Sequence, residues 1–189
     1  MRFLVIIFLF CVGLSANAQA DSTFTNLKEA IAAGLGVKVL ILKKQKLTEF
    51  PKEITQLTNL VILDLSKNKI TQIPKEIGNL TALKELNLSR NKVDSLPVEL
   101  GQLRQLDKLI LHHNSFRSLP DSFGTLVNLT YLDADFTNIS TIPTAMGGCR
   151  KMAFFNAQHS YISKDTRLEI RKILPHDCIQ LFPLTCKCN

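Results

Sequence analysis

The sequence predicts an α/β solenoid, a curved, horseshoe-shaped stack of repeats with a parallel sheet on its concave side. Three rows of residues with a spacing of 23 carry this prediction. Leucine or a substitute forms the first row, proline the second and glycine the third: Val37, Leu60, Leu83, Leu106, Leu129, Met152; Pro51, Pro74, Pro97, Pro120, Pro143; Gly78, Gly101, Gly124, Gly147. Five of the seven prolines therefore share one repeat position. A fixed period of this length is typical of solenoids, whose units bury their apolar faces against their neighbours.

Residues 1–20 have the composition of a secretory signal peptide. A basic Arg2 precedes an apolar run over residues 3–14, and small residues surround Ala18 and Ala20, either of which fits the cleavage rule. The apolar run is too short to cross a bilayer as a helix. We expect a secreted or periplasmic mature chain that has no transmembrane segment after cleavage.

Residues 21–36 are predicted to form an N-terminal helical cap. Asn26 can accept hydrogen bonds from the first turn of a helix, Glu29 can reach back to the cap, and Gly34 or Gly36 can end the helix. Solenoids must cover their open edge strands, so we expect this helix to cover the first repeat.

Residues 37–162 hold six repeats, of which the unit from Leu83 reads LxxLxLxxNxVxxLPxxLGxL. The alternation around Leu86 and Leu88 predicts a short strand. Because the strands recur in one direction, the sheet must be parallel, with neighbours about 4.8 Å apart. The predicted inward rows are Leu40, Leu63, Leu86, Leu109, Leu132, Phe155; Leu42, Leu65, Leu88, Leu111, Ala134, Ala157; Leu47, Ile70, Val93, Phe116, Ile139, Ile162.

An asparagine row marks the turn that leaves each strand. Asn68, Asn91 and Asn114 hold this position, which Gln45, Thr137 and Ser160 take in the other repeats. An amide both donates and accepts, so a stack of amides can satisfy turn backbone groups. With its apolar, Asn, Pro and Gly rows in register, the chain resembles the leucine-rich repeat family over residues 37–181. The resemblance is to the 23-residue form with LPxxIGxL in its second half, found in Ras-suppressor-like and bacterial repeats.

Residues 163–189 are predicted to form a C-terminal cap. The LPxxIG segment is missing here, and Ser163 instead opens a helix that runs to about Leu174 and stops before Pro175. Residues 178–182 then form the last predicted strand.

The cysteines fit an exported protein. Cys11 leaves with the signal peptide, which leaves Cys149, Cys178, Cys186 and Cys188. An even number of cysteines in an exported chain favours disulfides, and we expect two, either Cys149–Cys188 with Cys178–Cys186 or Cys149–Cys186 with Cys178–Cys188. Cys149 also stands in a leucine row, so the alternative is a small buried hydrophobic residue. No zinc site is expected, because one Cys-x-Cys has no matching histidine pair.

The formal net charge is +7, and it is unevenly placed. The row after the strand begins with Lys44, Lys67 and Arg90, and Lys46, Lys69 and Lys92 follow two positions later. This basic row indicates either a site for acidic groups or a solvated face. Aromatic residues gather in the last two repeats, where exposed rings in one patch favour a binding role.

No enzyme motif is present: the sequence has no glycine-rich phosphate loop, no HExxH and no suitably spaced carboxylate pair. His112 and Asp135 are neighbours in one row, so an enzyme centred on them is the weaker alternative. Nucleic acid is not expected, because the basic row has no interleaved aromatic residues.

The sequence therefore predicts a secreted, non-catalytic, monomeric recognition module with no cofactor and no metal. The expected ligand is a protein bound on the concave face; the alternative is an acidic polysaccharide or cell-envelope polymer bound by the basic row. The predicted binding residues are Lys44, Lys67, Arg90, Lys108, His112, His113, Tyr131, Asp133, Asp135, Phe136, Phe154, Asn156, His159 and Tyr161.

Overall fold

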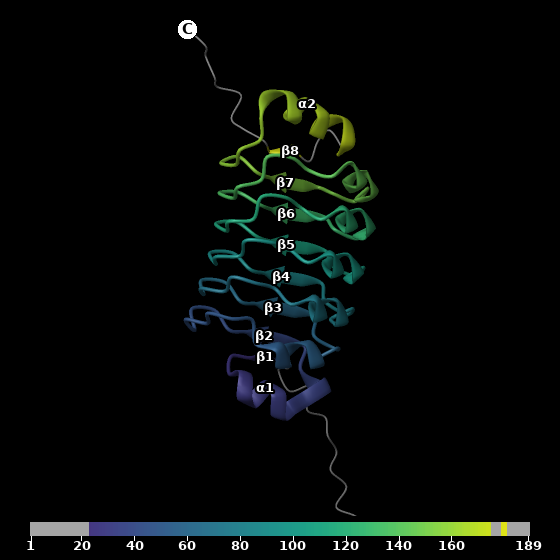
Figure 1. Ribbon diagram of the computed structural model, residues 1–189. Helices are drawn as coiled ribbons and strands as arrows, with labels where there is room; N and C mark the ends of the chain where they lie inside the picture. Colours follow the sequence, from purple (N-terminus) through teal and green to yellow (C-terminus); the bar gives the residue numbers. More distant parts are fainter. Residues whose placement is uncertain (1–22, 175–178, 181–189) are drawn as a thin grey trace, which may run out of the picture.

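A computed structural model describes residues 23–174 and 179–180 of the chain. One parallel sheet runs along the molecule with its strands in chain order (Figure 1). The strands are β1 (Thr23–Phe24), β2 (Val39–Ile41), β3 (Ile62–Asp64), β4 (Glu85–Asn87), β5 (Lys108–Ile110), β6 (Tyr131–Asp133), β7 (Phe154–Asn156) and β8 (Ile179–Gln180). The predicted signal peptide and Cys178, Cys186 and Cys188 lie outside the described residues.

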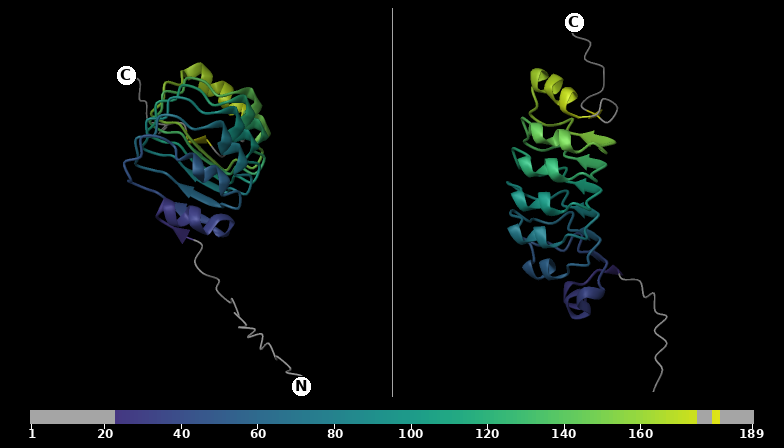
Figure 2. Two further views of the ribbon diagram at one scale, coloured as in Figure 1. Left: turned by 60° about the horizontal axis from the view of Figure 1, so that its bottom comes forward. Right: turned by 90° about the vertical axis from the view of Figure 1, so that its right-hand side faces the viewer.

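The second layer consists of short 3₁₀ helices on the side opposite the sheet (Figure 2, right). They are η2 (Lys52–Gln56), η3 (Lys75–Asn79), η4 (Val98–Gln102), η5 (Asp121–Thr125) and η6 (Thr144–Gly148). Each begins directly after a proline of the proline row, whose fixed φ suits an extended entry and whose missing N–H needs no partner. The proline row thus sets where the chain turns back.

The strands show the predicted alternation. From β2 to β7 the central residue is buried and its two neighbours are half-buried. The pairing advances by one repeat at each step, as in Leu63↔Leu86 and Leu86↔Leu109. The inward rows are buried as expected, except that Leu47 in the first repeat is only partly buried.

The asparagine row forms a ladder through the core. The side-chain amide of Asn91 donates to the carbonyls of Leu65 (3.0 Å) and Leu88 (2.9 Å), and its oxygen accepts from the amide of Ile70 (3.0 Å). Each asparagine therefore links its own turn to the preceding repeat. The ladder fixes the turn that carries the exposed residues described below.

The two caps agree with the prediction in part. Helix α1 (Leu27–Ala33) is capped by Asn26, which accepts from the amides of Lys28 and Glu29, and ends at Gly34 with φ 57° before η1 (Gly34–Gly36). The edge of β2, however, is paired with β1, so a two-residue strand and not the helix alone covers the first repeat. Helix α2 (Lys164–Ile173) begins after its predicted cap Ser163, which accepts from the amide of Thr166.

Cys149 is a fully buried free thiol in the structure, as the alternative of a small core residue predicts. The two disulfides stay a prediction, because the other three cysteines lie outside the described residues. The sulfur of Cys149 donates to the carbonyl of Phe123 at 3.2 Å, and the residue packs in the leucine row of η5 and η6 as a small apolar residue. Burial raises the pKa of the thiol to about 11. Within the described ranges, no helix is long and apolar enough to cross a membrane.

Candidate functional site

The exposed face of the sheet presents two residues from each repeat, one on either side of the buried strand centre. Strand pairing places equivalent residues beside each other, so that one row crosses β4 to β7. The members of this row are Glu85, Lys108, Tyr131 and Phe154. The next outward row places Asp133 beside Asn156.

A stacked pair of rings stands at the C-terminal end of this row. The rings of Tyr131 and Phe154 lie 4.4 Å apart between centroids and are nearly parallel, at 5°. The Lys108 ammonium lies 5.7 Å from the Tyr131 ring centroid and 3.2 Å from a carboxylate oxygen of Glu85. The lysine is therefore held between a carboxylate and a ring, which orders the row across four repeats.

The turn that follows each strand has an unusual backbone. Lys44, Lys67, Arg90, His113 and Phe136 all adopt positive φ, between 48° and 60°. A side chain makes this left-handed conformation costly, by about 1–2 kcal/mol per residue. Hydrogen bonds between repeats offset this cost. The amides of Lys44, Lys67, Arg90 and His113 each donate to a carbonyl of the next repeat. The predicted row after the strand thus lies on the turns at the carboxyl edge of the sheet.

Three rings of this turn row form a second stack. The Phe136 ring lies between the imidazoles of His113 (4.5 Å, 10°) and His159 (4.1 Å, 9°), and His112 meets His113 edge-on at 5.2 Å. Phe136 nevertheless stays 47% exposed, so its edge faces solvent although both faces are covered. The stack spans three repeats and preorganises a hydrophobic edge beside the sheet.

Asp135 anchors one end of this stack. Its carboxylate lies 3.0 Å from Nδ1 of His159 and accepts the backbone N–H of His159 at 2.7 Å. Burial opposes ionisation of Asp135, but hydrogen bonds from the backbone and side chain of His159 outweigh it, so the pKa of Asp135 is lowered. The sequence suggested a hydrogen-bonded pair of His112 with Asp135. The Asp135 carboxylate is instead paired with His159, one repeat further on.

A half-buried polar group lies between the two stacks. Asp133 accepts hydrogen bonds from the amide of Asp135 (3.1 Å) and the side chain of Asn156 (3.2 Å). Burial raises the pKa of Asp133, although the Asp135 amide and the charge of His112 oppose the shift. The pKa of His112 is lowered, chiefly by burial, which outweighs the attraction of Asp133. The sheet therefore offers a carboxylate, an amide and an imidazole between its aromatic stacks.

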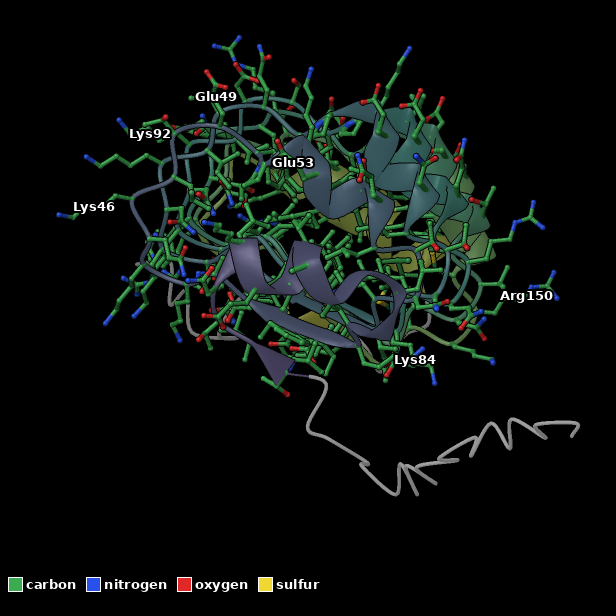
Figure 3. The ribbon with its side chains drawn as sticks, turned by 90° about the horizontal axis from the view of Figure 1, so that it is seen from below. Lys46, Glu49, Glu53, Lys84, Lys92 and Arg150 are labelled. Carbon is green, nitrogen blue, oxygen red and sulfur yellow. The ribbon has the colours of Figure 1, made fainter. Side chains whose placement is uncertain are left out.

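The N-terminal repeats present cations at the same turns. Lys44, Lys67 and Arg90 are exposed and follow one another along the row, and the pKa of Lys67 is lowered, first by the charge of Lys44. Two positions later, Lys46 and Lys92 extend away from the body of the molecule (Figure 3). The predicted basic row is thus a single charged edge.

The structure brings the predicted residues together in two groups, the cationic edge of the early repeats and the stacks of the late ones. Tyr161 stands apart as the most exposed aromatic residue described, at 75%, and it stacks on no other ring of the described residues. Sequence reasoning identified the rows but missed the stacking of Phe136 between two histidines. The signal was present, since His113, Phe136 and His159 are consecutive members of one row.

Comparisons with known proteins place this arrangement in a family. Residues 74–174 match the family described as "Leucine-rich repeat region", and residues 36–93 match "Leucine rich repeat". Curated protein sequences give no significant match.

Solved structures agree with the family matches. A leucine-rich repeat protein of Leptospira interrogans is 31% identical, with a TM-score of 0.61 over 80% of this chain and 45% of that protein. The receptor kinase ectodomain GASSHO1/SCHENGEN3 of Arabidopsis thaliana, solved with CASPARIAN STRIP INTEGRITY FACTOR 2, is 25% identical, with a TM-score of 0.65 over 75% and 18%. An internalin of Listeria monocytogenes shares the fold, at 23% identity and a TM-score of 0.65 over 78% and 42%.

The chain spans less than half the length of each of these three solved structures. The family match nevertheless covers more than half of the chain, and it coincides with the repeats, the asparagine ladder and the parallel sheet. The protein belongs to the leucine-rich repeat family.

Proposed function

We propose that this chain is an exported, non-catalytic recognition module that binds a protein partner on the exposed face of its sheet. The observation that carries the proposal is the pair of preorganised aromatic stacks, Tyr131–Phe154 and His113–Phe136–His159. Rings that are already held in place lose little conformational freedom on binding, and aromatic residues dominate the energetics of protein interfaces.

The geometry of the stacks favours a polypeptide over a sugar at this site. Both faces of Phe136 are covered by imidazoles, and Tyr131 and Phe154 cover one face of each other. At Phe136 only the ring edge therefore remains available, and this edge carries a positive partial charge that suits carbonyl oxygens, carboxylates and edge-on rings. Asp133 and Asn156 add the polar partners that backbone N–H and C=O groups require.

The comparisons support the same conclusion. The GASSHO1/SCHENGEN3 ectodomain was solved in complex with CASPARIAN STRIP INTEGRITY FACTOR 2, and RGFR1, a plant peptide hormone receptor 29% identical to this chain, was solved with RGF2. Such ectodomains act outside the cell, which agrees with the signal-like composition of residues 1–20.

Site-specific crosslinking tests the proposal. A photoreactive phenylalanine replaces Tyr161, which is exposed two residues after His159 of the second stack. In a matched protein it replaces Val98, which is exposed on η4 at the opposite side. Both proteins are incubated with cell-surface extracts and irradiated. We expect a discrete, protease-sensitive adduct with the Tyr161 probe and none with the Val98 probe.

The aromatic stack must then account for the adduct. In the Tyr161 probe protein, Tyr131→Ala with Phe154→Ala should abolish it, because hot-spot aromatics contribute about 2 kcal/mol or more. Lys75→Ala with Glu76→Ala, on η3, should leave it unchanged. An adduct that survives the aromatic substitutions, or one that resists protease but yields to glycosidase, would refute a protein partner at this face.

A further inference from the structure

We propose that the cationic edge of the first three repeats is a second binding site, for a linear acidic polysaccharide, separate from the aromatic site. The site, called the basic column below, comprises Lys44, Lys46, Lys67, Lys69, Arg90 and Lys92. It shares no residue with the stacks on which the proposed protein-binding function rests.

The backbone fixes the spacing of these six side chains. In the first file, the amides of Lys44 and Lys67 donate forward to the carbonyls of Ser66 (3.0 Å) and Ser89 (2.9 Å). In the second file, the amides of Lys69 and Lys92 donate back to the preceding repeat, at 2.7 and 2.9 Å. Successive cations of a file are thus held at the spacing of the repeats, about 4.8 Å between neighbouring strands. The result is two parallel files of charge along the axis of the solenoid.

The charge of this half of the molecule is not compensated. Residues 23–92 contain twelve Lys and Arg against six Asp and Glu, whereas residues 93–189 contain ten against nine. None of the six side chains of the basic column makes a salt bridge within the described part of the chain. The lowered pKa of Lys67, caused first by Lys44, shows that the cations repel one another. An anionic ligand that runs along the column relieves this repulsion.

The surroundings of the column select the class of polyanion. The residues interleaved with the cations are polar and carry no ring on which a base could stack: Lys43, Gln45, Ser66, Asn68, Ser89, Asn91. No large apolar side chain is exposed at these turns, so the column lacks what a protein needs to enter a lipid surface. A polymer with one anionic group on each successive sugar matches a file with one cation on each repeat.

Calorimetric titration of the full chain with a short oligogalacturonate tests the site. We expect binding that weakens as the salt concentration rises, because the cations of the protein displace counterions from the polyanion on binding. Lys44→Gln, Lys67→Gln and Arg90→Gln together should weaken binding by about tenfold or more and lower the slope of log K against log salt by about three. The matched control is Lys75→Gln, Lys84→Gln and Arg104→Gln, which removes the same charge from exposed positions away from the column (Lys84 in Figure 3). It should alter the affinity by less than about twofold.

Every other outcome decides against the proposal. Equal losses in the two triple variants would show attraction to net charge without a site, and no binding near physiological ionic strength would remove the site altogether. Tighter, column-dependent binding of single-stranded DNA, oligoglutamate or anionic vesicles would overturn the class of ligand. Tyr131→Ala with Phe154→Ala should leave polysaccharide binding intact, so failure of this site and failure of the aromatic site give different results.

Discussion

A single asparagine at the turn satisfies three backbone groups in each of the central repeats. Asn114 accepts from the amide of Val93 at 3.0 Å and donates to the carbonyls of Leu88 (3.0 Å) and Leu111 (2.7 Å). Asn114→Ala should lower the free energy of unfolding by about 2–3 kcal/mol, since each unsatisfied buried group costs about 1–3 kcal/mol. Urea unfolding measures this. Asn138→Ala, which removes one exposed bond, is the control, and equal effects would contradict the ladder's role.

The buried thiol of Cys149 should be unreactive toward alkylating reagents in the folded protein. Its pKa of about 11 keeps it protonated, and it has no exposed surface. Since the thiolate is the reactive form, iodoacetamide at about pH 8 should leave Cys149 unmodified in the native state and modify it in denaturant without prior reduction. Peptide mass mapping gives the result. Modification that required a reductant would show that Cys149 is in a disulfide after all.

The carboxyl group of Asp133 works against stability at neutral pH. Burial raises its pKa, so the folded state binds the proton more tightly than the unfolded chain does. The ionised form therefore costs stability above the folded pKa, and the cost disappears as pH falls through the unfolded value of about 3.9. Asp133→Asn, which keeps an acceptor oxygen, should raise the free energy of unfolding at neutral pH and leave it unchanged near pH 3. A gain at both pH values would point to packing instead of charge.

At the scale of elements, the stacking of the 3₁₀ helices depends on glycine at one position but not at its equivalent. A Cβ on Gly124 in η5 would meet the backbone of Ala145 in η6, whereas a Cβ on Gly147 in η6 finds its nearest neighbour, the carbonyl oxygen of Ile173, at 3.5 Å. Gly124→Ala should destabilise by about 1–3 kcal/mol through overpacking. Gly147→Ala should be neutral or stabilising by up to about 1 kcal/mol. Thermal unfolding of both variants compares them, and similar losses would argue against tight helix stacking.

The strands and turns were predictable where the sequence repeats. The leucine and asparagine rows placed β2 to β7 and the turns that follow them, because each position meets the same neighbours in every repeat. Strand β1 was missed, since two residues have no periodicity to detect. For Cys149 the sequence left a choice between a core residue and a disulfide, because a cysteine in a leucine row suits both, and its burial favours the core residue.

At the scale of the whole molecule, the site was predictable as rows but not as contacts. Register alone placed Tyr131 beside Phe154 and His113 beside Phe136. Which carboxylate meets which imidazole depends on how the side chains lean across the repeats. The backbone N–H and Nδ1 of His159 both contact the Asp135 carboxylate, so this carboxylate is held by the histidine of the following repeat. Periodicity thus predicts which residues share an edge, and side-chain packing decides how they pair.

Weakening the central repeat should destabilise the repeats on both sides of it. Leu88 is fully buried between Leu65 and Leu111, near the middle of the sheet. Leu88→Ala should lower the free energy of unfolding by about 2–5 kcal/mol, the range for buried leucines. Because each repeat contacts only the next, amide exchange should quicken first in β3 to β5 and then toward both caps.

Val98→Ala is the matched control for this substitution, because Val98 belongs to the same repeat but is 62% exposed. It should shift stability by no more than about 0.5 kcal/mol. Exchange measured by mass spectrometry under native conditions separates the possible outcomes. Quickening confined to one side of β4 would show that the halves are held by something other than nearest-neighbour packing, and unchanged stability would mean that Leu88 does not belong to the inner row.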